Sequence, residues 1–148
     1  MYEVKMLKDF SPIISNVVAA PKDDVKHRAL WREKYNPQEL QKMKVLIDGC
    51  RENDVIFYYG ISPGLDMTYS SADDLARLKA KLDQLVSLGC RGFAVLWDDI
   101  DTHLRPADAG AFNSLADAHV KICNQVSCHP CLGALFLFKK TLPLNWRG

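Results

Sequence analysis

The sequence predicts an α/β fold built on a sheet of parallel strands. Segments rich in β-branched and aromatic residues alternate with amphipathic segments of helical spacing, a pattern typical of βαβ units. The strand-like segments are continuously apolar, as expected of strands that are covered on both faces. An open doubly wound sheet and part of a (β/α)8 barrel both satisfy this pattern. No G-x-G-x-x-G or P-loop motif follows any of the strands, which lowers the support for nucleotide-binding folds.

Composition is that of a single globular domain. The chain has 148 residues, of which 48% are hydrophobic and 25% charged, so a core can form. The formal net charge of +1 favours neither nucleic acid nor another strongly charged partner. No apolar run approaches the roughly 20 residues of a membrane span, and the charged N-terminus lacks the layout of a signal peptide. We therefore expect no nucleic-acid or membrane partner.

The first strand and the first helix are marked by their boundaries. The segment "SNVVAAPKDD", residues 15–24, contains a short β-branched strand that Pro21 ends. Asn36 fits the N-cap of the following helix and Pro37 its first position. Apolar residues then recur at helical spacing and predict one buried stripe, formed by Leu40, Met43, Leu46, Ile47 and Cys50.

The second strand and the second helix carry the clearest signals. "VIFYYGISPG", residues 55–64, is a continuous apolar strand closed by a turn. Ser71 and Asp74 resemble a capping box at the start of the next helix, and Gly89 fits the residue just past its end. The buried stripe of this helix is predicted to hold Leu75, Leu78, Leu82, Leu85 and Val86.

The third strand, "RGFAVLW", ends at Asp98 and Asp99. A third helix is predicted over "PADAGAFNSLADAHVKICNQ", residues 106–125, with Pro106 near its start. Its apolar side is predicted to comprise Phe112, Leu115, Ala116, His119, Val120 and Cys123.

Polar clusters follow all three strands. "APKDD", "ISPGLD" and "WDDID" stand where parallel strands present their carboxyl ends, which is where functional residues gather in both candidate architectures. Asp98 and Asp99 could form a pair of carboxylates with separate acid and base roles, as in glycoside hydrolysis. Together with Asp101 they could instead bind magnesium or calcium. A solvated strand end remains the simplest alternative.

The five cysteines, an odd number without a secretory signal, indicate reduced thiols. The cluster Cys123, Cys128, His129 and Cys131 invites a zinc interpretation, but its spacing matches none of the common paired-ligand patterns. We expect these residues to have a structural role and expect no metal.

The motifs "PKDDVKHRALWRE", "ISPGLD" and "DDID", in this order and with these separations, resemble glycoside hydrolase family 84. The resemblance implies a (β/α)8 barrel, of which this chain supplies roughly the second to fourth βα units. It also implies an enzyme that removes β-linked N-acetylglucosamine from serine and threonine of nuclear and cytoplasmic glycoproteins, by a substrate-assisted retaining mechanism. We therefore expect these glycoproteins as partners and a cytoplasmic or nuclear location. The resemblance implies no metal and no organic cofactor.

Three site residues follow from the resemblance. Asp99 matches the proton donor, the general acid and base. Asp98 matches the carboxylate that binds and orients the 2-acetamido group of the substrate, and Lys22 matches a sugar-binding residue. A non-catalytic carbohydrate-binding or regulatory role is the alternative.

Other polar residues of these motifs receive structural interpretations. We expect His27, Arg28 and Trp31 to organise their loop, and Asp66 to be a solvated loop residue. Asp101 is expected to hydrogen-bond locally. His119 is expected to be a core histidine, and Lys79 and Lys81 are expected to form a solvated face.

The resemblance divides the chain into three parts. Residues 1–17 are unassigned, residues 18–127 form a partial family 84 catalytic domain, and residues 128–148 form a divergent tail. The glycine-aromatic loop that begins the family's barrel has no counterpart in the first segment. A full barrel takes about 250 residues, so we expect a partial catalytic domain that is unstable or inactive by itself.

Overall fold

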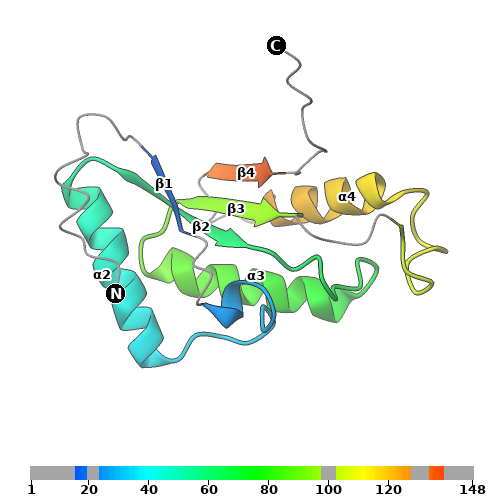
Figure 1. Ribbon diagram of the computed structural model, residues 1–148, viewed down its shortest axis with the longest axis horizontal. Helices are drawn as coiled ribbons and strands as arrows, with labels where there is room; N and C mark the ends of the chain where they lie inside the picture. Colours follow the sequence, from blue (N-terminus) through cyan, green and yellow to red (C-terminus); the bar gives the residue numbers. More distant parts are fainter. Residues whose placement is uncertain (1–15, 20–23, 98–102, 128–133, 139–148) are drawn as a thin grey trace, which may run out of the picture.

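The structure, a computed structural model, describes residues 16–19, 24–97, 103–127 and 134–138 (Figure 1). Strands and helices alternate along the chain. The elements are β1 (Asn16–Ala19), a 3-10 turn η1 (Val25–His27), α2 (Pro37–Glu52), β2 (Ile56–Ile61), α3 (Ala72–Ser87), β3 (Gly92–Leu96), α4 (Leu115–Ser127) and β4 (Ala134–Phe138).

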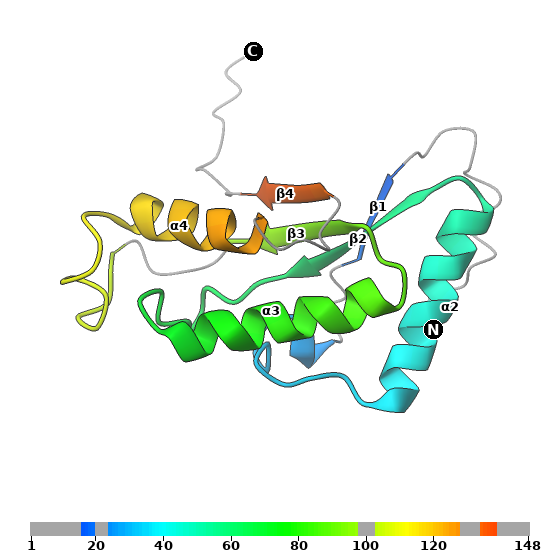
Figure 2. The same cartoon turned by 180° about the vertical axis from the view of Figure 1, so that it is seen from behind.

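The four strands form one parallel sheet in the order β1-β2-β3-β4. The register pairs Ala19 with Tyr59 and Ile61 with Val95. Each crossover moves one strand further in the same direction, so right-handed connections place the helices on the same face; α3 and α4 are seen together on the near side in Figure 2. The predicted α/β class with parallel strands is confirmed. Strand β4 comes from the segment that the sequence assigned to a divergent tail.

The core fills the space between the sheet and the helices. Phe57, Tyr59 and Ile61 alternate along β2 and pack with the buried stripe of α3. Residues on both faces of β2 are buried, as its continuous apolarity predicts. On the opposite face Gly92 of β3 pairs with Tyr58 of β2, and a Cβ on Gly92 would lie 2.4 Å from the ring of Tyr58. Gly92 therefore leaves room for an aromatic ring on the neighbouring strand.

The ends of α2 and α3 agree with the predicted signals. Asn36 caps α2 in a full capping box with Glu39. Ser71 caps α3 by accepting the amide of Asp74, but the Asp74 carboxylate binds elsewhere, so the box is only half formed. Gly89 follows α3 with φ of 93°, a conformation that favours glycine. Among the helices that the structure describes, none has the length and apolarity needed to cross a membrane.

The third helix begins later than predicted. Residues 106–114 form turns, and α4 starts at Leu115, where the Ser114 hydroxyl accepts the amide of Asp117. The predicted start failed because the buried Asp108 carboxylate accepts amides of a neighbouring loop and holds this segment in turns. The predicted apolar side is confirmed at His119 and Cys123, which are buried, and at Phe112 and Leu115, which pack against the core. Ala116 and Val120 are exposed, and the face comprises Ala118, His119, Ile122, Cys123 and Val126.

Candidate active site

The three strands that precede the predicted polar clusters end at the same carboxyl edge of the parallel sheet. Asp24 follows β1, Ser62 follows β2 and Trp97 follows β3. The amide of Ser62 donates to the carbonyl of His27 at 2.8 Å, which joins the first two segments. The predicted site residues Lys22, Asp98 and Asp99, and also Asp101, lie outside the described residues. The structure therefore describes the residues that precede and follow them in the sequence.

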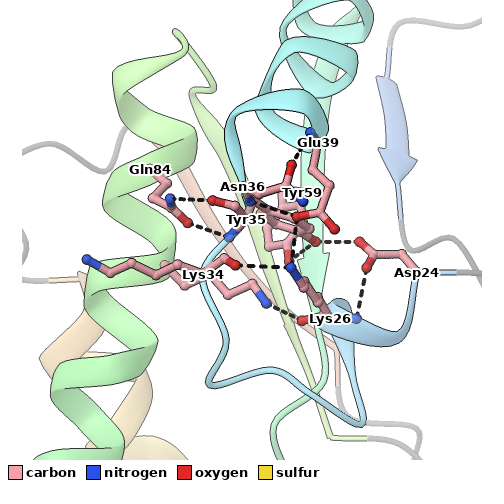
Figure 3. Close-up of polar contacts among 9 residues, drawn as sticks. Asp24, Lys26, Lys34, Tyr35, Asn36, Glu39, Tyr59 and Gln84 are labelled. Atoms are coloured by element: carbon pink, nitrogen blue, oxygen red, sulfur yellow. Dashed lines mark hydrogen bonds and ion pairs between the residues drawn. The ribbon is translucent and has the colours of Figure 1, made fainter.

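The segment after β1, residues 24–36, is called the β1 loop below. Its first described residue, Asp24, accepts the amide of Lys26 at 2.8 Å and the hydroxyl of Tyr35 (Figure 3). The Tyr35 hydroxyl also lies 2.9 Å from the hydroxyl of Tyr59 on β2. Burial is the main cause of the raised pKa of Tyr35, and the nearby Tyr59 and Asp24 raise it further. Burial also raises the pKa of Tyr59, so both phenols stay neutral. The result is a hydrogen-bonded chain from the loop into the core.

A second set of contacts closes the β1 loop on itself. The ammonium of Lys26 lies 2.8 Å from a carboxylate oxygen of Glu39 and 3.2 Å from the carbonyl of Lys34. The same Glu39 oxygen accepts the amide of Asn36 in the capping box. The hydrogen bond from Lys26, followed by that from Asn36, lowers the pKa of Glu39. The start of α2 and the first turn of the loop are thus held together.

Lys81 contradicts its sequence interpretation. It was expected on a solvated face, yet it is fully buried on α3 and its ammonium donates to the carbonyl of Lys26. Its spacing was the available signal, because Lys81 lies three residues after Leu78 and four before Leu85, on the buried stripe. Lys79, two residues earlier, is partly exposed. Gln84 adds a second link, accepting the amide of Tyr35 at 2.9 Å and donating to its carbonyl at 3.0 Å.

The loop after β2 is tied to the β1 loop through Arg32. Its guanidinium lies 2.6 and 2.7 Å from the two oxygens of Asp74, and 2.5 Å from Asp66. Asp66 also accepts the indole N–H of Trp31 at 2.7 Å, so it is no mere solvated residue, although its side chain is 52% exposed. Burial opposes ionisation of Asp74, but hydrogen bonds from Arg32 and the Thr68 amide lower its pKa overall. The expected structural role of Trp31, which is fully buried, is confirmed.

Aromatic residues hold the end of β3. Trp97, the last described residue before Asp98, stacks on His119 with ring centroids 4.2 Å apart and planes 6° apart. The ring nitrogen Nε2 of His119 lies 3.2 Å from the hydroxyl of Tyr69, whose ring packs edge-on against Trp97. His119 is buried, which confirms the core histidine that the sequence predicts. These three rings, Tyr69, Trp97 and His119, are called the aromatic cluster.

Asp108 caps the loop that leads into the aromatic cluster. It is fully buried and accepts the amides of Tyr69 and Ser70, at 3.1 and 2.7 Å. A carboxylate with two backbone donors is a strong, charge-assisted anchor. No local pattern indicated this role, since Asp108 lies inside the segment predicted to be helical.

The described residues offer no metal centre. Within the described ranges, no group of three or more histidine, cysteine, aspartate or glutamate side chains could hold an ion. Of the cysteine cluster considered for zinc, only Cys123 is described, and it is a buried free thiol; burial raises its pKa. The alternative ion site of Asp98, Asp99 and Asp101 lies outside the described residues.

Comparison with known proteins adds the chemical context. A family model described as beta-N-acetylglucosaminidase matches residues 8–131. The protein O-GlcNAcase of Rattus norvegicus is 44% identical over 128 residues, which is 86% of this chain and 14% of that protein. A variant of the O-GlcNAc hydrolase of Thermobaculum terrenum superposes with a TM-score of 0.81 at 29% identity, over 84% of this chain and 27% of that one. A second solved structure, CpGH84B, gives a TM-score of 0.62 at 39% identity, over 66% of this chain and 18% of that one.

Proposed function

The chain belongs to the β-N-acetylglucosaminidase family, glycoside hydrolase family 84, and from this we propose that it hydrolyses β-linked N-acetylglucosamine on serine and threonine of glycoproteins. The observation that carries the proposal is that β1, β2 and β3 are parallel and end at the same sheet edge. There the buried Trp97 directly precedes Asp98 and Asp99. The chain spans only 14% of the length of the rat relative, so the activity of that whole protein is only proposed for this chain.

We propose that the four strands belong to a (β/α)8 barrel, with residues 18–127 covering roughly its second to fourth βα units. The sequential strand order supports this, because a doubly wound sheet reverses its order at a switch point and a barrel does not. In a barrel, catalytic residues come from the carboxyl ends of several strands. In the sequence, the polar clusters of this chain directly follow the carboxyl ends of β1, β2 and β3.

The first step of the proposed reaction uses both carboxylates. Asp98, ionised, accepts the N–H of the 2-acetamido group and orients it. The acetamido oxygen then attacks the anomeric carbon, and the bond to the serine or threonine oxygen breaks. Asp99, protonated, gives its proton to that leaving oxygen. The products are a cyclic oxazolinium ion, whose N–H stays hydrogen-bonded to the Asp98 carboxylate, the released hydroxyl side chain and an Asp99 carboxylate.

The second step regenerates the enzyme. The Asp99 carboxylate takes a proton from water, and the water oxygen attacks the anomeric carbon from the face that the leaving group vacated. The bond between the anomeric carbon and the acetamido oxygen breaks, so the sugar leaves with retained configuration. The two carboxylates need different environments, since one must stay ionised while the other holds a proton. Lys22 is proposed to bind the sugar hydroxyls beside them.

The proposed substrates are glycosylated nuclear and cytoplasmic proteins. The name of the rat relative, protein O-GlcNAcase, supports this substrate class. A second candidate function is a carbohydrate-binding or regulatory fragment that keeps the pair without turning over substrate. The observation that favours this second candidate is that the chain covers only 14% of the rat relative and 27% of the bacterial one.

Turnover of a chromogenic N-acetylglucosaminide separates these candidates. We expect hydrolysis by the wild type to fall by on the order of 10²-fold or more in Asp99→Asn, the range typical of a lost general acid, and to be unaffected by a chelator. Binding of an N-acetylglucosamine-thiazoline inhibitor without turnover would favour the binding fragment. Hydrolysis that Asp99→Asn leaves unchanged, or that a chelator abolishes, would contradict the proposed mechanism.

A further inference from the structure

Lys81 is an unusual residue for the buried face of α3. Its side chain is fully buried, and Leu78, Leu82 and Leu85 share its stripe on the helix. A lysine ammonium that leaves water without compensation is costly. Burial lowers the pKa of Lys81 to about 8, while the neighbouring Asp24, Glu33 and Glu39 act in the opposite direction. The burial of Lys81 therefore has to be compensated by the groups that its ammonium contacts.

Among the described residues, the hydrogen-bond and cation–π partners of that ammonium belong to one segment. Lys81 donates to the carbonyl of Lys26 and lies 4.6 Å from the ring centroid of Tyr35. Both partners are in the β1 loop. Gln84, one turn further along α3, pairs with the backbone N–H and carbonyl of the same Tyr35. Lys81 and Gln84 of α3 thus hold the β1 loop near its start, at Lys26, and near its end, at Tyr35.

The contacts of Lys81 extend through Lys26 and Tyr35 to Asp24. Lys26 accepts Lys81 through its carbonyl and donates its amide to Asp24 at 2.8 Å, so the position of Lys26 sets that of Asp24. Tyr35 in turn donates its hydroxyl to Asp24. Asp24 stands two residues after Lys22, the proposed sugar-binding residue. A shift of the β1 loop would therefore move Asp24, the described residue after β1 that is nearest in sequence to Lys22.

We propose that Lys81 is a positioning residue for the proposed sugar site, which holds the β1 loop, and with it Asp24, in the orientation needed to bind N-acetylglucosamine. The inference rests on the proposed function. Lys81 does not touch substrate; it acts through Lys26, Tyr35 and Asp24. An apolar residue of the same length would fill the core equally well, but would leave the Lys26 carbonyl without its donor.

The test compares Lys81→Met with a matched control, Lys79→Met, two residues away on the partly exposed side of α3. Amide hydrogen exchange is read for the β1 loop, whose bonds include Leu30 N to Val25 O at 2.8 Å, and for β3 as an internal reference. We expect Lys81→Met to accelerate exchange in the β1 loop by roughly tenfold, as for one lost charge-assisted hydrogen bond, with β3 unchanged. Lys79→Met should leave both at the wild-type rate.

Calorimetric binding of an N-acetylglucosamine-thiazoline inhibitor supplies the second arm. We expect affinity to fall roughly tenfold in Lys81→Met and to stay at the wild-type value in Lys79→Met. Unchanged exchange in the β1 loop, or a loosened loop with unchanged affinity, would overturn the positioning role. If the wild type does not bind the inhibitor, the proposed function fails, while the exchange arm still decides whether Lys81 holds the loop.

A second variant covers the case in which Lys81→Met does not fold. Lys81→Gln keeps a polar end but is one atom too short to reach the Lys26 carbonyl, so it should loosen the same loop. Failure of both variants to fold, while Lys79→Met folds, would overturn the proposal, because it would show that Lys81 stabilises the whole fold rather than one loop.

Discussion

The β1 loop and the aromatic cluster support the same sheet edge by different means. The β1 loop is held by charges and amides, through Lys26, Arg32 and Lys81. The aromatic cluster is held by ring stacking, with a single buried carboxylate, Asp108, capping its loop. Interactions among charges respond to pH and salt, whereas ring packing responds to volume and shape. The chain that follows Lys22, the proposed sugar-binding residue, is thus held mainly by contacts among charged groups. The chain that precedes Asp98 and Asp99 is held mainly by aromatic packing.

The largest effect is expected on the aromatic side, from Asp108→Ala. This change removes the acceptor of the buried amide of Tyr69 and of the partly buried amide of Ser70. We expect the free energy of unfolding to fall by about 3 kcal/mol, since each orphaned buried donor is costly. Urea denaturation measures it. Asp117→Ala, in the exposed first turn of α4, is the control and should cost at most about 0.5 kcal/mol; an equal loss in both variants would sink this account.

His119→Ala should have the next largest effect. It removes the ring stacked on Trp97 and the bond to the Tyr69 hydroxyl, for a loss of about 2 kcal/mol. The neighbouring Val120, 57% exposed, is the control, and Val120→Ala should stay within about 0.5 kcal/mol. Thermal unfolding of the two variants decides whether the aromatic cluster depends on this stack; a loss in Val120→Ala that equals that in His119→Ala would deny it.

Arg32→Lys tests the charged side. A lysine cannot reproduce the two-pronged contact with Asp74 while also reaching Asp66. We expect a loss of about 1.5 kcal/mol at low salt that shrinks as sodium chloride is raised, because Arg32 and Asp66 are partly exposed. The exposed pair of Arg77 with Asp73 is the reference, and Arg77→Ala should cost about 0.3 kcal/mol. A loss independent of salt would contradict the electrostatic assignment.

The smallest expected effect is a pH dependence of the difference between wild type and Lys81→Met. Burial lowers the pKa of Lys81 in the folded state to about 8, below the ordinary lysine value of 10.5, so the unfolded chain binds more protons between these two pH values. Wild-type stability should therefore rise relative to Lys81→Met by about 1 kcal/mol from pH 7 to pH 9. Asp24, Lys26, Glu33 and Glu39 face the group and remain in both proteins. A difference that stays constant with pH would show that Lys81 does not titrate in this window.

The elements of the fold were largely readable from the sequence. Local signals set the ends of α2 and α3, through Asn36, Ser71 and Gly89, and the continuous apolarity of β2 predicted burial on both of its faces. The start of α4 was misplaced because Asp108 bonds to amides 38 and 39 residues earlier in the chain. Such a contact exists only in the folded molecule, and no local pattern announces it.

The frame of the site was less predictable than its motifs. Lys81 lay at core spacing, but lysine is so rarely buried that its residue type outweighed its position. Asp66 was taken for a solvated residue because its partners, Trp31 and Arg32, are more than 30 residues away in sequence. The sites of Lys22, Asp98 and Asp99 follow from the family resemblance and remain predictions.

The central claim is that Asp98 binds the acetamido group of the sugar at the edge held by these two supports. The most direct measurement is the affinity of an N-acetylglucosamine-thiazoline inhibitor for the wild type, Asp98→Asn and Asp101→Asn. The account predicts binding to the wild type, a roughly hundredfold loss in Asp98→Asn as for a charged hydrogen bond, and little change in Asp101→Asn. Equal affinity in the wild type and Asp98→Asn would contradict it.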